Sequence, residues 1–443
     1  MHRLPHIQST LSVLAIGLLV LAAVQFSGGS SSAVPTKDTS IVSDDDDDLV
    51  GLDAAEQASN RPTVEAAFRL EGYRPGETAR LRFFSSAADV SLEIVHAGTE
   101  TVRIVRKDVM VGHTVRASRP IGSVRPGREL SIELGNWPSG LYFARLTAAG
   151  GRAGYAPFVL QPRRLGEHRV AVVLSTLTWQ AYNFRDDDDD GTPDTWYGDP
   201  TTNTARLARP YENRGTPRHY RWYDQPFLRW LSATGRNVDY FSDRGLNLVS
   251  SGAALAHAYD LIVFPGHHEY VTAHEYDIVT DFRNRGGNLM FLAANNFFYR
   301  VDIDGDVMTR VGRWRDAGRP EAQLVGVQYI GWNLERYDSR PYVVRGSSSM
   351  PWVFRGTGLH DGDRFAAGGI EIDARAAASP RNVKVLAVIP DVFGSGMTAE
   401  MTYYRTPGGA KVFAAGAFSV AASIWNRPMQ RIVENLWARL AQP

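Results

Sequence analysis

Two kinds of hydrophobic pattern divide the chain. Between about Pro62 and Pro162, short segments of alternating apolar and polar residues are separated by Gly and Pro turns, which is typical of half-buried strands. Seven short strands within about 100 residues predict an immunoglobulin-like β-sandwich. The segments are VEAAFRL, ARLRFFS, VSLEIVH, TVRIVR, LSIEL, LYFARLTA and APFVL. We therefore expect an all-β domain over residues 61–163.

From about His168 the pattern changes to continuous apolar runs that alternate with helical segments. RVAVVLS, YDLIVFPG and NLMFLAA are uninterrupted runs, as expected of strands buried on both faces of a parallel sheet. Helices are expected at Asp224–Ala233, at Glu275–Asn284 and from about Arg427 to Leu440. This alternation predicts a doubly wound α/β domain over residues 164–443, with ligands at the carboxyl ends of its strands.

The amino-terminal segment has the pattern of an export signal. Leu11 to Val24 is almost entirely apolar, but this run is shorter than the ~20 residues that a membrane-spanning helix needs. Ser31 and Ala33 follow at the −3 and −1 positions of a cleavage site. We expect a signal peptide over residues 1–33 and a secreted or extracytoplasmic protein. A retained signal-anchor, which alone would imply a membrane, stays open. Residues 34–60 are expected to form a disordered acidic linker.

Composition excludes several classes of chemistry. The 443 residues include 48 Lys and Arg and 48 Asp and Glu, so the formal net charge is zero, which argues against a nucleic-acid partner. The chain has no cysteine. Disulfides, thiol nucleophiles, iron–sulfur clusters and Cys-ligated zinc are therefore excluded, and any reaction must use oxygen and nitrogen groups.

Polar side chains follow two of the predicted strands. YDLIVFPGHHEY places His267, His268 and Glu269 at the end of a buried strand. Imidazole and carboxylate groups together suit iron, zinc or manganese, and open α/β sheets bind ligands at this position. The alternative is a surface loop with solvated histidines. STLTWQAYN, after the first α/β strand, places Tyr182 and Asn183 at the same crevice, unless its aromatic residues only cover the sheet.

The segment RDDDDDGTPDTWYGD, residues 185–199, has the spacing of a calcium loop. Alternate carboxylates of a tight loop can converge on one hard cation, and a glycine permits the sharp turn. Five consecutive aspartates fit this pattern in more than one register. The candidate calcium ligands are Asp186, Asp188, Asp190 and Asp194. Bound Ca²⁺ would brace a loop beside the site.

A further candidate is Glu400, just before a strand-like run in GMTAEMTYYRTPGG. Its neighbours Ala399 and Met401 are apolar, and partial desolvation would raise the pKa of the carboxyl group towards the range of a general base. The alternative is an exposed acid on an edge strand.

Several motifs together resemble known families. YDLIVFPGHHEY, a helix and GGNLMFLAANN resemble the core of class I glutamine-amidotransferase-like domains. Leu292 to Asn296 stand where those domains carry the Cys nucleophile, so their thiol chemistry is excluded. With SGLY, TWQAYN, GHHEY, NNFFYRV and AEMTYYR, residues from about 60 to 443 resemble the N,N-dimethylformamidase large (beta) subunit family. The resemblance implies hydrolysis of a small amide by one iron, held by two tyrosine phenolates and a glutamate.

This resemblance also implies roles for five residues. Glu269 and Tyr182 correspond to iron ligands, and Tyr142 is the candidate for the second phenolate. His267 and Glu400 correspond to the histidine and glutamate beside the metal, which would move protons. Three anionic ligands suit Fe(III), which would polarise the amide carbonyl or activate water.

The leading hypothesis is an exported, metal-dependent hydrolase of a C–N bond in a small-molecule amide or a related substrate. An Asp-rich loop, an Arg-rich stretch at Arg310–Arg319 and the lack of an evident small subunit depart from the family, and favour a substrate larger than a one-carbon amide. A homo-oligomer stays open. One alternative is a non-catalytic secreted or surface ligand-binding protein with a structural calcium loop. Another, by fold analogy alone, is a carbohydrate-active relative.

Overall fold

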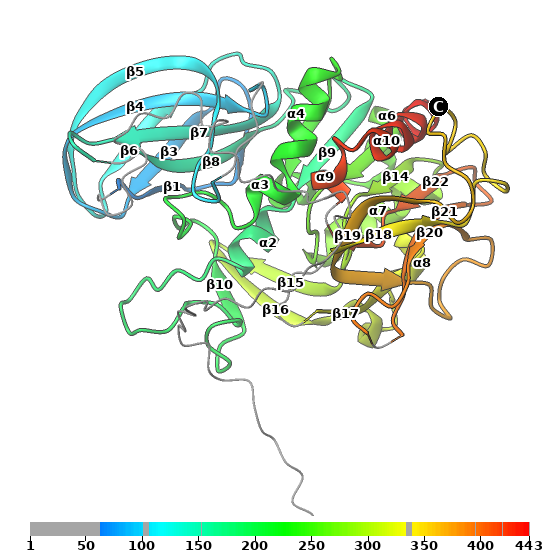
Figure 1. Ribbon diagram of the computed structural model, residues 1–443. Helices are drawn as coiled ribbons and strands as arrows, with labels where there is room; N and C mark the ends of the chain where they lie inside the picture. The colour runs from blue at the N-terminus through cyan, green and yellow to red at the C-terminus, as the bar shows by residue number, and fades with distance from the viewer. Residues whose placement is uncertain are drawn as a thin grey trace, which may run out of the picture. The chain divides into compact units, whose positions relative to one another are not determined.

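A two-sheet β region precedes a mixed α/β region (Figure 1). The computed structural model describes residues 63–442 except 101–105, 152, 334–338, 395 and 419. The predicted signal peptide and acidic linker lie outside the described residues. Within these residues, no helix is both long enough and apolar enough to cross a membrane.

The β region contains two sheets. The first has the order β1-β3-β6 and is antiparallel, and the second has the order β2-β8-β7-β4-β5, in which only β2 and β8 pair in parallel. The strands of the first sheet are β1 (Ala66–Phe68), β3 (Thr78–Phe83) and β6 (Glu129–Glu133). Those of the second are β2 (Gly72–Tyr73), β4 (Ala87–Ala97), β5 (Gly112–Val124), β7 (Gly140–Thr147) and β8 (Gly154–Leu160).

Alternation along these strands creates a shared core. In β3 every second side chain is buried, and Leu81 packs in one cluster with Leu92 of β4 and Phe158 of β8. The predicted sheets therefore bury apolar faces against each other. The immunoglobulin-like assignment of this region stays a prediction.

The α/β region is built on a long mixed sheet. Its first five strands are parallel in the order β11-β9-β12-β14-β22. These strands are β9 (Val170–Leu174), β11 (Asp239–Ser242), β12 (Leu261–Phe264), β14 (Asn288–Phe291) and β22 (Lys411–Ala414). The three apolar runs that the sequence marks as buried strands correspond to β9, β12 and β14, and all of their residues are buried.

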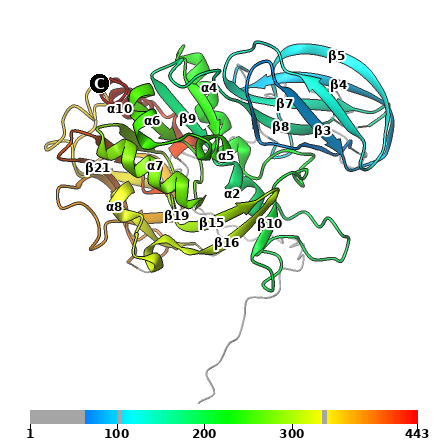
Figure 2. The ribbon, with the colours of Figure 1, turned by 180° about the vertical axis from the view of Figure 1, so that it is seen from behind.

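Helices accompany both faces of these strands. Val172 of β9 packs in a cluster with α4 (Gln225–Ala233) and α10 (Arg427–Leu440), whereas its neighbour Val173 packs with α5 (Asp243–Asn247), α6 (Gly252–Ala258) and α7 (Ala273–Asn284). Figure 2 shows α6 and α7 from the face opposite to that of Figure 1. The helices predicted at the positions of α4, α7 and α10 are confirmed. The doubly wound, amidotransferase-like class stays a prediction.

The remaining elements extend this framework. Antiparallel strands continue the long sheet in the order β22-β21-β20-β18-β19-β17, with β23 beside β19. A separate sheet has the order β10-β16-β15-β13. The strands are β10 (Thr204–Arg206), β13 (Tyr270–Val271), β15 (Tyr299–Asp304), β16 (Val307–Arg313), β17 (Gln328–Trp332), β18 (Ser339–Val344), β19 (Arg364–Ala374), β20 (Lys384–Ile389), β21 (Ala399–Arg405) and β23 (Ala417–Phe418). The short helices are α2 (Thr176–Ala181), α3 (Tyr220–Tyr223), η2 (Trp314–Ala317), α8 (Ala322–Val325) and α9 (Val420–Ser423).

The cluster that contains α10 should dominate stability. Leu436 of α10 is fully buried in it, so Leu436→Ala should lower the free energy of unfolding by roughly 2–5 kcal/mol, measured by urea denaturation. Leu248 is 80% exposed, so the control Leu248→Ala should cost less than about 0.5 kcal/mol. Equal losses for the two variants would contradict this assignment of the core.

Candidate functional site

The turn after β12 carries the two histidines and Glu269. His267 is 7% exposed, His268 0% and Glu269 2%, so the solvated-loop alternative for this turn is wrong. The backbone N–H groups of Glu269 and Tyr270 both point at Thr178 Oγ1 of α2, at 3.2 and 3.4 Å. These contacts connect the turn to the helix that follows β9. Two strand ends of the parallel sheet therefore meet, as the sequence predicts.

Phenol hydroxyls surround the carboxylate of Glu269. Tyr182, directly after α2, donates a hydrogen bond to Glu269 Oε2 at 2.8 Å. The hydroxyl of Tyr197 donates to the Tyr182 oxygen at 2.8 Å and lies 3.3 Å from both carboxylate oxygens of Glu269. The Tyr270 hydroxyl in turn lies 2.5 Å from that of Tyr197. Two phenols thus converge directly on one buried carboxylate, and a third adjoins them.

Local packing holds Tyr197 in this position. Its ring stacks on that of Tyr182 with centroids 4.3 Å apart. Two residues earlier, Thr195 Oγ1 donates to the backbone oxygen of Ala181 at 2.6 Å, which fixes the chain beside the end of α2. Tyr197 is 38% exposed although its hydroxyl lies within the cluster. The ring therefore forms part of the solvent-facing wall of the site.

A second carboxylate and an imidazole complete the cluster. His267 Nε2 lies 3.3 Å from Glu269 Oε2 and 3.6 Å from Glu371 Oε2 of β19. Neither contact has the geometry of a hydrogen bond. The buried Nε2 therefore has no hydrogen-bond partner within the described chain. Asn295 Nδ2 donates to Glu371 Oε2 at 2.7 Å and keeps that carboxylate turned towards the histidine.

Burial dominates the electrostatics of this cluster. It raises the pKa of Glu269 to about 7, and hydrogen bonds from the tyrosines oppose this shift only in part. Burial, followed by the nearby charge of Glu269, raises the pKa of Glu371. The same two causes raise the pKa values of Tyr182 and Tyr197 well above their usual range. A cation at this point would therefore stabilise several acidic groups together.

The backbone around the cluster adopts unusual conformations. Asn295, Phe297 and Ile370 have φ angles of +54°, +60° and +63°, although none is a glycine. A β-branched residue with positive φ is a clear outlier, and such strain persists only where surrounding contacts over-determine it. Ile370 directly precedes Glu371. The strain therefore accompanies the segments that place Asn295 against Glu371 and Glu371 beside His267.

Tyr142, the predicted second phenolate, does not lie in this cluster. Its hydroxyl donates to the backbone oxygen of Pro138 at 2.7 Å, and its ring stacks on His96 at 4.4 Å. Alternation along β7 explains the difference. Leu141 and Phe143 face the cluster shared with the α/β region, whereas Tyr142 faces the core between the two β sheets. Tyr197, rather than Tyr142, is the second tyrosine beside Glu269.

Glu400 also lies outside the cluster. Its carboxylate accepts hydrogen bonds from Arg375 Nε at 2.8 Å and Nη2 at 2.9 Å. Burial alone would raise the pKa of Glu400, but the bonds and charge of Arg375 outweigh it and lower the pKa below its usual value. The expectation of a raised pKa is therefore wrong. Glu371, rather than Glu400, is the glutamate that lies beside His267.

The Asp-rich loop forms a separate polar group. One carboxylate oxygen each from Asp186, Asp188 and Asp194 lies within 4.8 Å of the others, whereas Asp190 Oδ1 accepts a hydrogen bond from Thr192 N. The backbone N–H groups of Gly191 and Asp187 donate to Asp186 and Asp194. The calcium assignment of this loop stays a prediction.

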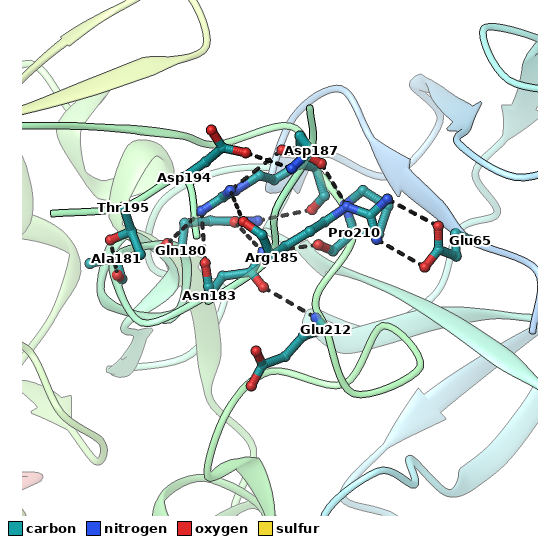
Figure 3. Close-up of polar contacts among 11 residues, drawn as sticks. Glu65, Gln180, Ala181, Asn183, Arg185, Asp187, Asp194, Thr195, Pro210 and Glu212 are labelled. Atoms are coloured by element: carbon teal, nitrogen blue, oxygen red, sulfur yellow. Dashed lines mark hydrogen bonds and ion pairs between the residues drawn. The ribbon is translucent and has the colours of Figure 1, made fainter. Parts of the chain in front are cut away.

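Arg185 ties the start of this loop to the β region. Its guanidinium forms a two-pronged ion pair with Glu65 at 2.9 and 3.0 Å and bonds Asp187 at 2.6 Å (Figure 3). Asn183, expected in the crevice, instead donates to Gln180 Oε1 and to the Pro210 backbone and accepts from Glu212 N. Asn183 therefore braces the loops rather than facing Glu269.

Sequence reasoning missed Tyr197 and Glu371 for different reasons. Tyr197 lies in the segment that the aspartates marked as a calcium loop, and the adjacent Trp196 was the available signal in the sequence. Glu371 and Asp373 occupy alternate positions of an otherwise apolar strand, IEIDA. Two acids on one face of a buried strand are expensive and indicate a site. Asp373 accepts from Asn295 N at 2.8 Å.

The fold and cluster define a mixed α/β protein with a buried tyrosine–carboxylate site. Residues 127–430 match the family described as "N,N-dimethylformamidase beta subunit-like, C-terminal". The chain therefore belongs to the N,N-dimethylformamidase beta subunit-like family.

Curated relatives support this membership at low identity. The N,N-dimethylformamidase beta subunit of Alcaligenes sp. is 26% identical, and that of Paracoccus aminophilus is 25% identical; each match covers 46% of this chain and 34% of the relative. The chain thus spans about a third of the length of these relatives. Among solved structures, Pseudomonas fluorescens alkylpurine DNA glycosylase AlkC has a TM-score of 0.14 at 16% identity, over 21% of this chain and 29% of that one.

Glu400 should contribute to stability in a pH-dependent way. Because its pKa is lowered in the folded state, its contribution is present above its usual value of 4.5 and is lost as the pH falls through the folded pKa. Glu400→Gln should lower the free energy of unfolding at pH 7 by up to about 1 kcal/mol, with a smaller difference at pH 3. In an Arg375→Met background only burial would act on Glu400 and would raise its pKa, so Glu400→Gln should no longer lower the free energy of unfolding more at pH 7 than at pH 3. A constant difference across this pH range would contradict the ion pair.

The calcium prediction has a direct test. Adding Ca²⁺ to chelator-treated protein should raise the thermal unfolding midpoint, and Asp188→Asn should reduce this shift because it removes one carboxylate of the group. Asp302→Asn, in the β15–β16 hairpin and outside this group of carboxylates, should show the same Ca²⁺-dependent rise as the unmodified protein. A thermal unfolding midpoint that does not change when Ca²⁺ is added would exclude calcium binding by this loop.

Proposed function

We propose that the chain is a hydrolase of a C–N bond in an amide, with one iron ion held by Tyr182, Tyr197 and Glu269. The observation that carries this proposal is the convergence of both phenol oxygens on Glu269, within 3.3 Å. Family membership supports the reaction class, since the matching relatives are named N,N-dimethylformamidase beta subunits.

The donor set fits a hard trivalent cation. Two phenolates and one carboxylate carry three negative charges, which suits Fe(III). The phenol pKa values are raised by burial and by the charge of Glu269, so the tyrosines stay protonated unless a cation replaces their protons. His267 Nε2, buried and without a hydrogen-bond partner in the described chain, faces the same point.

Residues of this chain would orient the substrate and move protons. A bound Fe(III) would supply Lewis acidity that polarises an amide carbonyl and acidifies water. Burial, followed by the charge of neighbouring histidines, lowers the pKa of His267, so its imidazole is neutral at pH 7 and Nε2 can accept a proton from an attacking water. Glu371 has a raised pKa and can hold a proton for the departing amine.

The wall of the site would exclude bulk water. The ring of Phe418 contacts His267 edge-on with centroids 4.6 Å apart, and Tyr223 packs on Phe418 at 4.9 Å. Together with the stacked rings of Tyr182 and Tyr197, these aromatic groups favour an uncharged amide over an ionic ligand. We also propose that the chain is exported and that it acts as a homo-oligomer or together with a second subunit.

The test exchanges the tyrosines singly. Tyr197→Phe should lower the iron affinity of the purified full chain at least 100-fold, since even partners of a metal ligand are worth about 10–100-fold, and should weaken the visible phenolate-to-iron band and amide hydrolysis. Iron is measured by elemental analysis.

Tyr142→Phe is the matched control. It removes only the hydrogen bond to Pro138, so iron content and colour should not change, while stability should fall by about 1 kcal/mol. Full iron in Tyr197→Phe, or loss of iron in Tyr142→Phe, would contradict the proposed ligand set.

A further inference from the structure

A second group of ligand-type side chains lies on the other side of the GHHEY turn. Asp243 begins α5, His268 belongs to the turn, and Glu275 lies in the first turn of α7. All three residues are 0% exposed. His268 Nε2 lies 2.7 Å from Asp243 Oδ1, and one ligand atom of each residue lies within 4.8 Å of the others. Three chain segments therefore bring an imidazole and two carboxylates to one buried point.

The two carboxylates are unequally satisfied. Asp243 Oδ2 accepts a hydrogen bond from Leu177 N at 2.7 Å, and Thr176 Oγ1 lies 3.4 Å away. Both oxygens of Glu275 are buried, and neither has a hydrogen-bond donor within the described chain. A carboxylate placed this way, next to a second one, is unstable unless a positive charge lies between them.

A proton or a metal cation could supply that charge. One proton shared with Asp243 would satisfy a single oxygen of Glu275 and leave the other buried without a partner. A divalent cation could contact Glu275, Asp243 Oδ1 and His268 Nε2 together, and two carboxylates would cancel its charge. The imidazole adds a third donor at the same point, which a shared proton does not require.

We propose that Asp243, His268 and Glu275 bind a divalent transition-metal cation of the zinc or manganese class, at a site separate from the tyrosine cluster. One nitrogen and two carboxylate ligands are typical of such ions. Ligand atoms around tetrahedral zinc lie about 3.3 Å apart, given metal–ligand bonds of ~2.0–2.1 Å, so binding requires only small side-chain shifts.

The position of the site suggests a structural role. The cation would hold α5 and the start of α7 against the turn that carries Glu269. Thr272 already caps α7 by accepting from Glu275 N at 3.1 Å, and Phe297 N donates to the backbone oxygen of His268 at 2.7 Å. Loss of the cation should therefore lower stability before it alters the chemistry at Glu269. This inference does not rest on the proposed reaction.

The experiment measures metals in the full chain with one isosteric variant. The unmodified protein is dialysed against Zn²⁺ and then against metal-free buffer, and should retain about one zinc per chain. Glu275→Gln keeps the side-chain volume but removes a charge, and should retain at least 10-fold less zinc. Its iron content and visible band should stay unchanged, and its unfolding midpoint should no longer rise with Zn²⁺.

Glu269→Gln is the matched control from the same buried region. It should lose iron while it retains zinc, which separates failure of this inference from failure of the proposed function. Retention of zinc by Glu275→Gln would overturn the inference. An unfolding midpoint of the unmodified protein that changes with neither Zn²⁺ nor Mn²⁺ would also overturn it, and would favour a proton shared between Asp243 and Glu275. If Glu275→Gln does not fold, anomalous diffraction of unmodified crystals at the zinc edge replaces it. A peak between Asp243, His268 and Glu275 is expected, and its absence after zinc soaking would overturn the inference.

Discussion

Burial of the Glu269 carboxylate is the constraint on which the site depends. A carboxylate removed from water is costly unless donors or a cation surround it. Tyr182 and Tyr197 supply hydroxyls at 2.8 and 3.3 Å, and they come from the end of α2 and from the last part of the Asp-rich segment. Both segments must therefore pack against the turn after β12. Thr178 and Thr195 fix them there through hydrogen bonds to the backbone.

Acidic groups lie on both sides of the same turn. Glu371 lies beside His267, and Asn295 joins Glu371 to Asp373. Asp243 and Glu275 lie beside His268. Burial raises the pKa of Asp373 to about 7, and it also raises the pKa of Glu275, so burial disfavours the charged form of both groups. Two separate cations, one beside Glu269 and one beside His268, would resolve the two clusters. The proposed iron site and the proposed structural cation site would thus both neutralise the charge of buried carboxylates.

Local patterns predicted the parts of the fold that depend on local physics. Uninterrupted apolar runs identified β9, β12 and β14, because burial on both faces of a sheet selects continuous apolar residues, and the helix α10 was also predicted close to its observed bounds. The antiparallel strands β17, β18 and β19 are partly exposed and contain Gly or Arg, so their pattern is weak. In the site, the turn with His267 and Glu269 was predicted, since it follows a strand. The position of Tyr142 was predicted wrongly because successive side chains of β7 point to opposite faces of the sheet. A shift of one residue therefore decides which core a side chain enters. Tyr197 and Glu371 carried weak local signals, an adjacent tryptophan and a second acid two residues further on, but which of these side chains lies beside Glu269 depends on contacts between distant segments, which the local sequence does not show.

The most direct measurement is anomalous diffraction at the iron edge, from crystals of the full chain purified without chelator. We predict one strong peak in contact with Tyr182, Tyr197 and Glu269, and no iron peak at Tyr142. A protein that contains iron elsewhere, or that excludes iron from the tyrosine cluster after reconstitution with iron, would contradict it.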